Sequence, residues 1–363
     1  MHSFDDEWGP ERVLEVYDPK TKVHGVVVID NTARGPGKGG MRLVPDISVS
    51  EVAGLARAMT WKNALADIPF GGAKAGIRAD PKKINKEQVI RSFARLLAPV
   101  IPKHYISGPD MNITEKEMGW FSDELNDKNA CTGKPACMGG LPHELGSTGF
   151  GVVQATKVAC EFTKLSLSGA TVAIEGYGNV GTFTHKFISE LGAKVVAISD
   201  SQGTAFSQNG LDYQTALKTK QTSGSITNYE GAKKLSASEL FKLDVDIIIP
   251  GARPNVINEQ NVADVKAKLV VEAANLPIKS QFELELAKRN ILVVPDFVAN
   301  AGGVISSYVE YIGGNSQDMF KMVEYKITNN TSKVLENSKN LNVRASALQI
   351  AQERVLDAMS YRK

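Results

Sequence analysis

Three lysines in the first third of the chain stand among glycines and apolar residues rather than on a polar face. They are Lys38 in GPGKGGMR, Lys62 in AMTWKNALADIPF and Lys74 in FGGAKAGI, and Asp110 follows in ISGPDMN. A lysine held away from water either has a shifted pKa or binds an anion. Three cations and one carboxylate in one region therefore predict a site for a small acid, with one lysine–carboxylate pair left for proton transfer.

A helix is expected to position Lys62. Ser48 or Ser50 would cap its start, and Glu51 would be favourable in its first turn. An apolar stripe with spacings of three, four and three ends in the lysine: Val52, Leu55, Met59 and Lys62. A lone lysine in this place more often extends from the edge of the stripe to water. Lys74, expected in a Gly-Gly-Ala-Lys-Ala-Gly turn, makes a shared site the better interpretation.

Short, apolar, β-branched runs alternate with helical stretches from about residue 148 onward. The runs are 171–175, 194–199, 246–249, 268–272 and 291–294. Such runs are typical of parallel strands that are buried on both faces. Nearer the start, the β-rich residues 22–30 predict a hairpin.

We therefore predict an α/β fold with two domains around a cleft. A mixed-sheet α/β domain for substrate binding and oligomerisation is expected at 1–145, and a Rossmann-like, doubly wound dinucleotide domain at 146–310. The C-terminal helices of 311–363 are expected to pack back on the first domain.

A glycine-rich turn, Gly176-Tyr-Gly178-Asn-Val-Gly181, directly follows the first of the predicted parallel strands and opens a helix. Gly176 permits the tight turn, Gly178 lets the backbone approach a pyrophosphate, and Gly181 lets the helix pack on the strand. The helix start, with Asn179 and Val180, would receive the negative charge. The motif alone is weak, but strand, turn, helix and second strand occur in the required order, which predicts an NAD or NADP site.

The second strand of this unit ends at Asp200, 19 positions after Gly181. An acid there can accept hydrogen bonds from the adenosine ribose and would repel a 2′-phosphate. The next residues, Ser201-Gln202-Gly203, offer no cation, so NAD is predicted over NADP.

Asn255 and Asn275 each follow a predicted strand, at the sheet edge where open α/β sheets bind ligands. We expect both to contact the cofactor, although asparagine after a strand is also a common turn former.

Composition excludes several classes of function. The net charge is only +2 and no basic face is visible, which argues against nucleic-acid binding. Apolar runs are too short to span a bilayer, and the acidic start MHSFDDEWGPER resembles no targeting peptide, so a cytoplasmic protein is expected. The three cysteines, Cys131, Cys137 and Cys160, match no zinc spacing and are expected to be reduced thiols, with no metal site.

Five segments together resemble the motifs of a known family, in the same order. GPGKGGMR, TWKNALADIPFGGAKAGI, GPDMN, GYGNVG and VPDFVANAGGVISSYVEY are similar to those of the glutamate/leucine/phenylalanine/valine dehydrogenases, and the resemblance spans residues 12–355. It implies oxidative deamination of an L-amino acid to a 2-oxo acid and ammonia, with hydride passed to a nicotinamide. It also implies a homo-oligomer, most often a hexamer among the glutamate enzymes.

The resemblance also assigns roles to single positions. Lys62 would bind the substrate α-carboxylate, Lys74 would be the catalytic lysine, and Asp110 its acid/base partner. Gly39 and Gly40, which follow Lys38 in the first motif, would lie against the substrate.

In the second half of the chain, the resemblance places Asn300 at both substrate and nicotinamide, next to a Gly302-Gly303 turn. Thr148 would meet the nicotinamide amide.

Lys38 and Ser307 indicate which amino acid is the substrate. Both resemble the glutamate-type members, whereas leucine-type members have apolar residues at these positions. A lysine and a hydroxyl suit a γ-carboxylate, and in an enzyme for apolar substrates the lysine would be buried and unpaired. Lys38 could instead be a solvent-facing loop lysine, and Ser307 a small helix-packing residue.

Two departures favour the leucine branch or limit what can be carried over: the short opening, and GSTG at 146–149, where glutamate-type chains usually have a glutamate. We predict a glutamate dehydrogenase. The alternatives are an NAD-dependent leucine, valine or phenylalanine dehydrogenase and, more remotely, a nucleotide-binding protein without catalysis.

Overall fold

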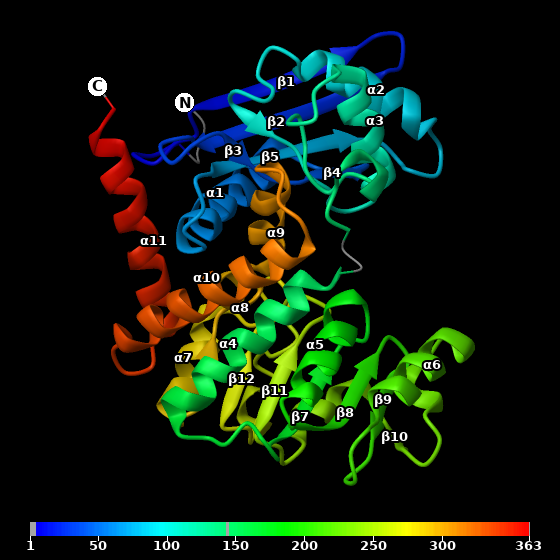
Figure 1. Cartoon of the computed structure of the whole chain (residues 1–363), viewed down its shortest axis with the longest axis vertical. Coiled ribbons are helices and arrows are strands. Elements are labelled where there is room, and N and C mark those ends of the chain that lie inside the picture. The colour runs from blue at the N-terminus through cyan, green and yellow to red at the C-terminus, as the bar shows by residue number, and fades with distance from the viewer. Residues whose placement is uncertain (1–4, 143–144, 363) are drawn as a thin grey trace. The chain divides into compact units, whose positions relative to one another are not determined.

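The computed structural model describes residues 5–142 and 145–362, which form two compact units (Figure 1). Unit 1 consists of Met1–Leu145, Val304–Met319 and Ile350–Lys363, and unit 2 of Gly146–Gly303 and Phe320–Gln349. The first segment of unit 1 ends at Leu145, and unit 2 begins at Gly146. Residues 311–363 are divided between the two units.

Unit 1 is built on a six-stranded mixed sheet in the order β1-β2-β5-β3-β6, with β4 beside β5. The strands are β1 (Arg12–Asp18), β2 (Val23–Asn31), β3 (Gly37–Lys38), β4 (Met41–Val44), β5 (Gly71–Arg78) and β6 (Tyr105–Ile106). β1 and β2 form the predicted antiparallel hairpin. β5 is antiparallel to β2 and parallel to β3 and β4, so it lies inside the sheet.

The segment around Lys74 is a strand, so the predicted Gly-Gly-Ala-Lys-Ala-Gly turn is wrong. Its glycines serve close packing instead of chain reversal. A Cβ atom on Gly72 would lie 2.1 Å from the hydroxyl of Thr60 on the neighbouring helix. Glycine in a strand interior often marks such a close approach of backbones, and here it brings the helix that carries Lys62 onto the strand that carries Lys74.

The helices of unit 1 are α1 (Val49–Leu65), α2 (Lys86–Leu97), α3 (Glu115–Leu125) and the short η1 (Ala136–Met138). Most of α9 (Gly302–Tyr311) also belongs to unit 1, but its first two residues belong to unit 2. Ser48 caps α1, accepting a hydrogen bond of 3.1 Å from the N–H of Glu51. The buried face of α1 includes Val52, Ala56 and Thr60. In the predicted stripe, Val52 is buried, whereas Leu55, Met59 and Lys62 are half-buried.

Unit 2 contains a seven-stranded sheet in the order β10-β9-β8-β7-β11-β12-β13. The strands are β7 (Thr171–Glu175), β8 (Lys194–Asp200), β9 (Gly203–Phe206), β10 (Lys233–Leu235), β11 (Ile247–Pro250), β12 (Leu269–Val271) and β13 (Leu292–Val294). All five predicted strands are present and parallel to their neighbours among the five. β9 and β10, which the sequence did not predict, extend the sheet in antiparallel pairing.

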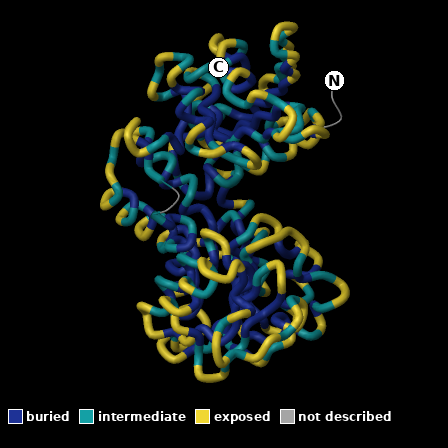
Figure 2. Tube along the Cα trace, turned by 90° about the vertical axis from the view of Figure 1, so that its right-hand side faces the viewer, coloured by how far each residue is buried: buried dark blue, intermediate teal, exposed yellow. Residues whose placement is uncertain are grey.

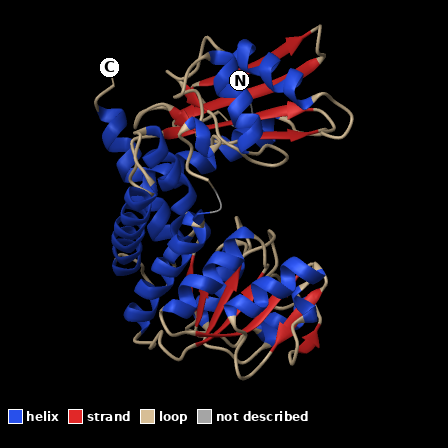
Figure 3. Ribbon diagram, turned by 45° about the vertical axis from the view of Figure 1, so that its right-hand side comes forward, coloured by secondary structure: helices blue, strands red, loops and turns tan. Residues whose placement is uncertain are grey.

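Helices flank this second sheet (Figure 3). They are α4 (Ser147–Thr163), α5 (Asn179–Glu190), α6 (Tyr213–Ser223), α7 (Ser280–Lys288) and α8 (Asp296–Ala299), with short η3 (Ile226–Asn228), η4 (Ala237–Lys242) and η5 (Val262–Asp264). The division between the units falls within α9, α10 (Ser316–Glu336) and α11 (Val343–Ser360).

Buried residues occupy the interior of each unit (Figure 2). Within the described ranges, no helix is both long and apolar enough to cross a membrane.

Candidate active site

Lys74 and Asp110 meet in unit 1. Lys74 projects from β5 and is 6% exposed, and its ammonium donates a hydrogen bond to Oδ2 of Asp110. Asp110 lies in the loop after β6 with 19% of its side chain exposed. The structure therefore brings together the two residues predicted for proton transfer.

The surroundings of the pair favour an easily deprotonated lysine beside an ionised carboxylate. Burial lowers the pKa of Lys74, and although Asp110 opposes this effect, the pKa stays below its ordinary value. Burial acts on Asp110 in the opposite sense, but Lys74 and Arg42 together bring the pKa of this carboxyl below its ordinary value. A lysine with a lowered pKa is suited to acid/base work near neutral pH.

Gly39 and Gly40 lie so close to neighbouring residues that there is no room for a side chain at either position. A Cβ atom on Gly39 would lie 1.7 Å from the carbonyl oxygen of Ala73, and one on Gly40 would lie 2.9 Å from Cβ of Asp110. The two glycines therefore allow the chain after β3 to run between Lys74 and Asp110's loop. Their contact with a substrate stays a prediction.

Lys38 is buried on β3, with 4% exposure, so the alternative of a solvent-facing loop lysine is wrong. Its Nζ donates a hydrogen bond of 2.7 Å to the carbonyl oxygen of Ser107. Burial lowers the pKa of Lys38 to about 7. Lys62, in the last turn of α1, and Ser307, on α9, are half-buried in the same unit. The binding roles of these residues stay predictions.

Lys134, buried like Lys38 and Lys74, was missed from the sequence. Its Nζ lies 2.6 Å from Oε1 of Glu310 on α9 and donates 2.8 Å to the carbonyl oxygen of Cys131. Glu310 also accepts hydrogen bonds of 2.9 Å from the backbone N–H groups of Gly133 and Leu141.

In unit 2, the glycine turn after β7 has the tight backbone and the open space that the sequence predicts for a pyrophosphate site. Gly176 has φ +94°, and a Cβ atom on Gly181 would lie 1.9 Å from the carbonyl oxygen of Gly176. A Cβ atom on Gly178 would meet nothing within 4 Å, so the backbone there faces open space. Asn179 and Val180 begin α5, whose start carries no side-chain cap in the described part of the chain. Helix starts of this kind bind phosphate groups, so the turn fits a dinucleotide.

Asp200 ends β8 as predicted, but its carboxylate has more partners than expected. Nζ of Lys220, on α6, lies 2.8 Å from Oδ2, and the N–H groups of Gln202 and Ile226 also donate to the carboxylate. Burial raises the pKa of Asp200, but these partners bring it below its ordinary value. The residues directly after Asp200 offer no cation, but Lys220 supplies one from 20 positions away.

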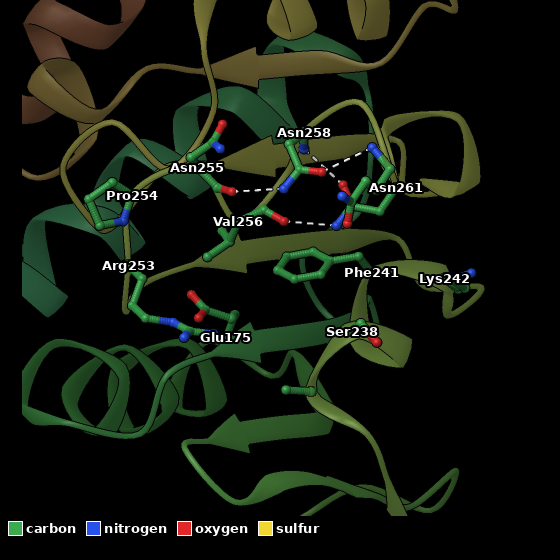
Figure 4. A pocket seen from close by; sticks show the side chains of 12 residues that line it. Glu175, Ser238, Phe241, Lys242, Arg253, Pro254, Asn255, Val256, Asn258 and Asn261 are labelled. Carbon is green, nitrogen blue, oxygen red and sulfur yellow. Dashed lines mark hydrogen bonds between the residues drawn. The ribbon is translucent and has the colours of Figure 1, made fainter.

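A pocket of about 670 Å³ opens next to the carboxyl ends of β7 and β11 (Figure 4). Glu175, Arg253 and the predicted Asn255 line it, together with Ser238 and Phe241 of η4. Asn255 has the positive φ of a turn former, +55°, and its backbone carbonyl accepts a hydrogen bond from Asn258. The residue therefore shapes the turn and also faces a pocket of ligand-binding size.

Asn300 and Asn275 lie together in unit 2. Nδ2 of Asn300 donates 3.0 Å to Oδ1 of Asn275 and reaches the carbonyl oxygen of Ala273 at 3.2 Å. Thr148, in the first turn of α4, packs on Gly303, where its hydroxyl would lie 3.1 Å from an added Cβ.

The predicted Gly302-Gly303 turn is instead the start of α9. Glycine is needed there because a Cβ atom on Gly302 would lie 2.1 Å from the carbonyl oxygen of Ser147.

Two family models match the chain. Residues 139–363 match the glutamate/leucine/phenylalanine/valine dehydrogenase model, and residues 10–127 match the Glu/Leu/Phe/Val dehydrogenase dimerisation domain. The chain belongs to the glutamate/leucine/phenylalanine/valine dehydrogenase family.

Named relatives of this dehydrogenase cover almost its whole length. It is 39% identical to the glutamate dehydrogenase of Aeropyrum pernix, over 97% of this chain and 91% of that protein. It is also 39% identical to the NADP-specific glutamate dehydrogenase of Saccharolobus shibatae, over 97% and 90% of the two chains. Its structure resembles the hetero-hexameric glutamate dehydrogenase of Thermus thermophilus with a TM-score of 0.86 and 30% identity, covering 98% and 90% of the chains.

Sequence reasoning missed three charged residues of this dehydrogenase that contact or neighbour the predicted site: Arg42, Lys134 and Lys220. Arg42 stands inside the quoted motif GPGKGGMR, but its partner Asp110 is 68 positions away. Glu310, an acid inside the apolar run VISSYVEYI, was the one available signal for a buried ion pair.

Proposed function

We propose that this dehydrogenase catalyses the reversible oxidative deamination of L-glutamate to 2-oxoglutarate and ammonia, with NAD or NADP as the hydride acceptor. The observation that carries the proposal is the buried contact between Lys74 and Asp110 in the unit that also buries Lys38. Among the described residues, no carboxylate forms an ion pair with Lys38, so a carboxylate of the substrate can take that place.

Different lysines bind the two carboxylates of glutamate. Lys62 binds the α-carboxylate, while Lys38 and the hydroxyl of Ser307 bind the γ-carboxylate. A leucine-like substrate would leave the ammonium of the buried Lys38 without an anion, which is unfavourable for a buried charge. Burial of Lys38 thus supports an acidic side chain over an apolar one.

Lys74 and Asp110 move the protons. A bound nicotinamide would supply the hydride acceptor for the substrate Cα, and water would then add to the oxidised carbon. Lys74, with its lowered pKa, takes the proton from the attacking water and stabilises the oxygen that forms. Asp110 transfers protons to and from the substrate nitrogen, so that ammonia can leave.

Unit 2 binds the dinucleotide at the glycine turn of Gly176, Gly178 and Gly181, with Thr148 and Asn300 next to the nicotinamide. We propose NAD as the preferred form, because the ionised Asp200 suits ribose hydroxyls better than a 2′-phosphate. Lys220 offsets part of this charge, so the preference over NADP is expected to be small. A relative is named an NADP-specific glutamate dehydrogenase, which is consistent with a cofactor preference that differs between members of the family.

The protein is proposed to be a homo-oligomer, with a hexamer as the expected form and the cytoplasm as the expected location. The match of residues 10–127 to a dimerisation domain supports self-association, and the similar Thermus thermophilus enzyme is described as hetero-hexameric.

Initial rates of NADH oxidation test the proposal, with saturating ammonium and either 2-oxoglutarate or 4-methyl-2-oxopentanoate, followed by the same comparison with NADPH. A strong preference for 2-oxoglutarate is expected. A preference for the branched acid would instead identify a leucine-type enzyme, and no turnover with either acid would point to a nucleotide-binding protein without catalysis.

A further inference from the structure

The two carboxylate oxygens of Asp110 have different surroundings. Oδ1 accepts hydrogen bonds from Nε of Arg42 at 3.1 Å and from the N–H of Met111 at 2.7 Å, whereas Oδ2 contacts Lys74. One oxygen is therefore held by a fixed cation and the backbone. The other faces the lysine that exchanges protons.

Arg42 is itself well placed to hold this oxygen. It lies on β4, paired with Gly76 of β5, and is therefore in the strand next to the one that carries Lys74. Its Nη1 donates 3.1 Å to Oε1 of Glu51, in the first turn of α1. The guanidinium, with 20% of the side chain exposed, thus has a carboxylate on either side and cannot rotate without losing one of them.

We propose that Arg42 is a positioning residue for proton transfer, which holds Oδ1 of Asp110 so that Oδ2 remains the oxygen facing Lys74. The proposal rests on the function proposed above. In the assigned step, a proton leaves the substrate nitrogen and binds Oδ2, and it returns from the same oxygen. Oδ1 keeps its two hydrogen bonds throughout.

Arg42 also supplies positive charge to both members of the pair. It favours the ionised form of Asp110 and the neutral form of Lys74, so it lowers the pKa of each. Among the described residues, Glu51 also contacts Arg42, and Asp110 also affects the pKa of the buried Tyr105. Loss of the guanidinium should therefore raise both pKa values and move the whole pH–rate profile to higher pH.

The test compares Arg42→Met and Arg42→Lys with Arg78→Met as the matched control. Arg78 lies on β5 and bonds to the carbonyl oxygen of Ile47 and to Glu15, away from Asp110. For Arg42→Met, we expect kcat to fall about tenfold or more with little change in KM, and the profile to move up by about one pH unit. Arg42→Lys keeps the charge without the arginine geometry, so its kcat should fall while its profile stays near that of the wild type.

An unchanged profile in Arg42→Met would overturn the proposal, and so would a shift of the same size in the Arg78 control. If Arg42→Met does not fold, Arg42→Lys decides, because wild-type kcat in that variant would contradict a positioning role. A wild type that turns over neither oxo acid contradicts the proposed function itself, which separates the two failures.

Discussion

Lys134 and Glu310 form a buried ion pair, with 2.6 Å between Nζ and Oε1 and only 5% and 2% of the two side chains exposed. Glu310 stands three residues after Ser307 on α9, so the two side chains share a face of this helix. Glu310 also accepts hydrogen bonds from the backbone N–H groups of Gly133 and Leu141. Together with the ion pair, these hydrogen bonds connect the segment 133–141 to the helix that carries Ser307. These contacts therefore help to position Ser307, which is proposed to bind the γ-carboxylate together with Lys38.

Breaking this pair from one side should destabilise the protein strongly. Lys134→Met leaves Glu310 buried without its cation, and Glu310→Leu leaves Lys134 without its anion. Each should lower the free energy of unfolding by about 3–5 kcal/mol, the usual result of leaving one member of a buried ion pair uncompensated. Denaturant unfolding measures the loss.

The double variant Lys134→Met/Glu310→Leu should lose less than the sum of the two single losses, because it leaves no uncompensated charge. Lys83→Ala, which removes the exposed pair with Asp80, is the matched surface control and should not move the unfolding midpoint. Strictly additive losses would contradict the description of Lys134 and Glu310 as a coupled pair.

Lys38 should make substrate binding depend on pH. Its pKa of about 7 in the free protein means that the ammonium loses its proton as the pH rises through neutrality, and a bound carboxylate favours the charged form. The dissociation constant of 2-oxoglutarate from the enzyme–NADH complex should therefore rise about tenfold per pH unit above 7. Fluorescence titration of bound NADH without ammonium measures it.

Lys38→Met should bind 2-oxoglutarate weakly and with a flatter pH dependence. An equally steep dependence in this variant would show that another group is responsible, and the γ-carboxylate would have to be assigned to a different residue.

Structure could be predicted from the sequence where the hydrophobic pattern of a segment or a single local motif determines it. The five parallel strands of unit 2 were predicted because strands buried on both faces appear as continuous apolar runs. The segment around Lys74 was misinterpreted because glycines that serve close packing and glycines that form turns look alike without knowledge of the neighbouring helix. Contacts between distant segments could not be predicted, as for Lys134 and Glu310, which are 176 positions apart.

Asp200 and Lys220 should set the choice between NAD and NADP together. Lys220→Gln leaves the negative charge of Asp200 unopposed, so the ratio of kcat/KM for NADH to that for NADPH should increase several-fold. Asp200→Asn removes the charge while keeping an acceptor for the N–H of Ile226, and it should shift the ratio toward NADPH.

Initial rates with both reduced cofactors at fixed 2-oxoglutarate and ammonium give these ratios. Lys194→Gln, at the opposite end of β8, is the control and should leave the ratio at its wild-type value. If both Asp200→Asn and Lys220→Gln leave it unchanged, the 2′-position of the ribose lies elsewhere, and the selectivity assigned to the end of β8 is wrong.

Lys74 and Asp110 should affect turnover without affecting the binding of the dinucleotide, because they belong to unit 1 whereas the glycine turn belongs to unit 2. Lys74→Ala removes the group that takes a proton from water, and its turnover should fall below detection or by about 10³-fold or more. Asp110→Asn keeps the size of the side chain but can no longer accept a proton, so its turnover rate should fall as well.

The dissociation constant of NADH should stay within about twofold of wild type in both variants, as measured by fluorescence. Turnover of Lys74→Ala within tenfold of wild type would refute the catalytic assignment, whereas a loss confined to NADH affinity would mean that the pair acts on the structure of the protein and not on the chemistry.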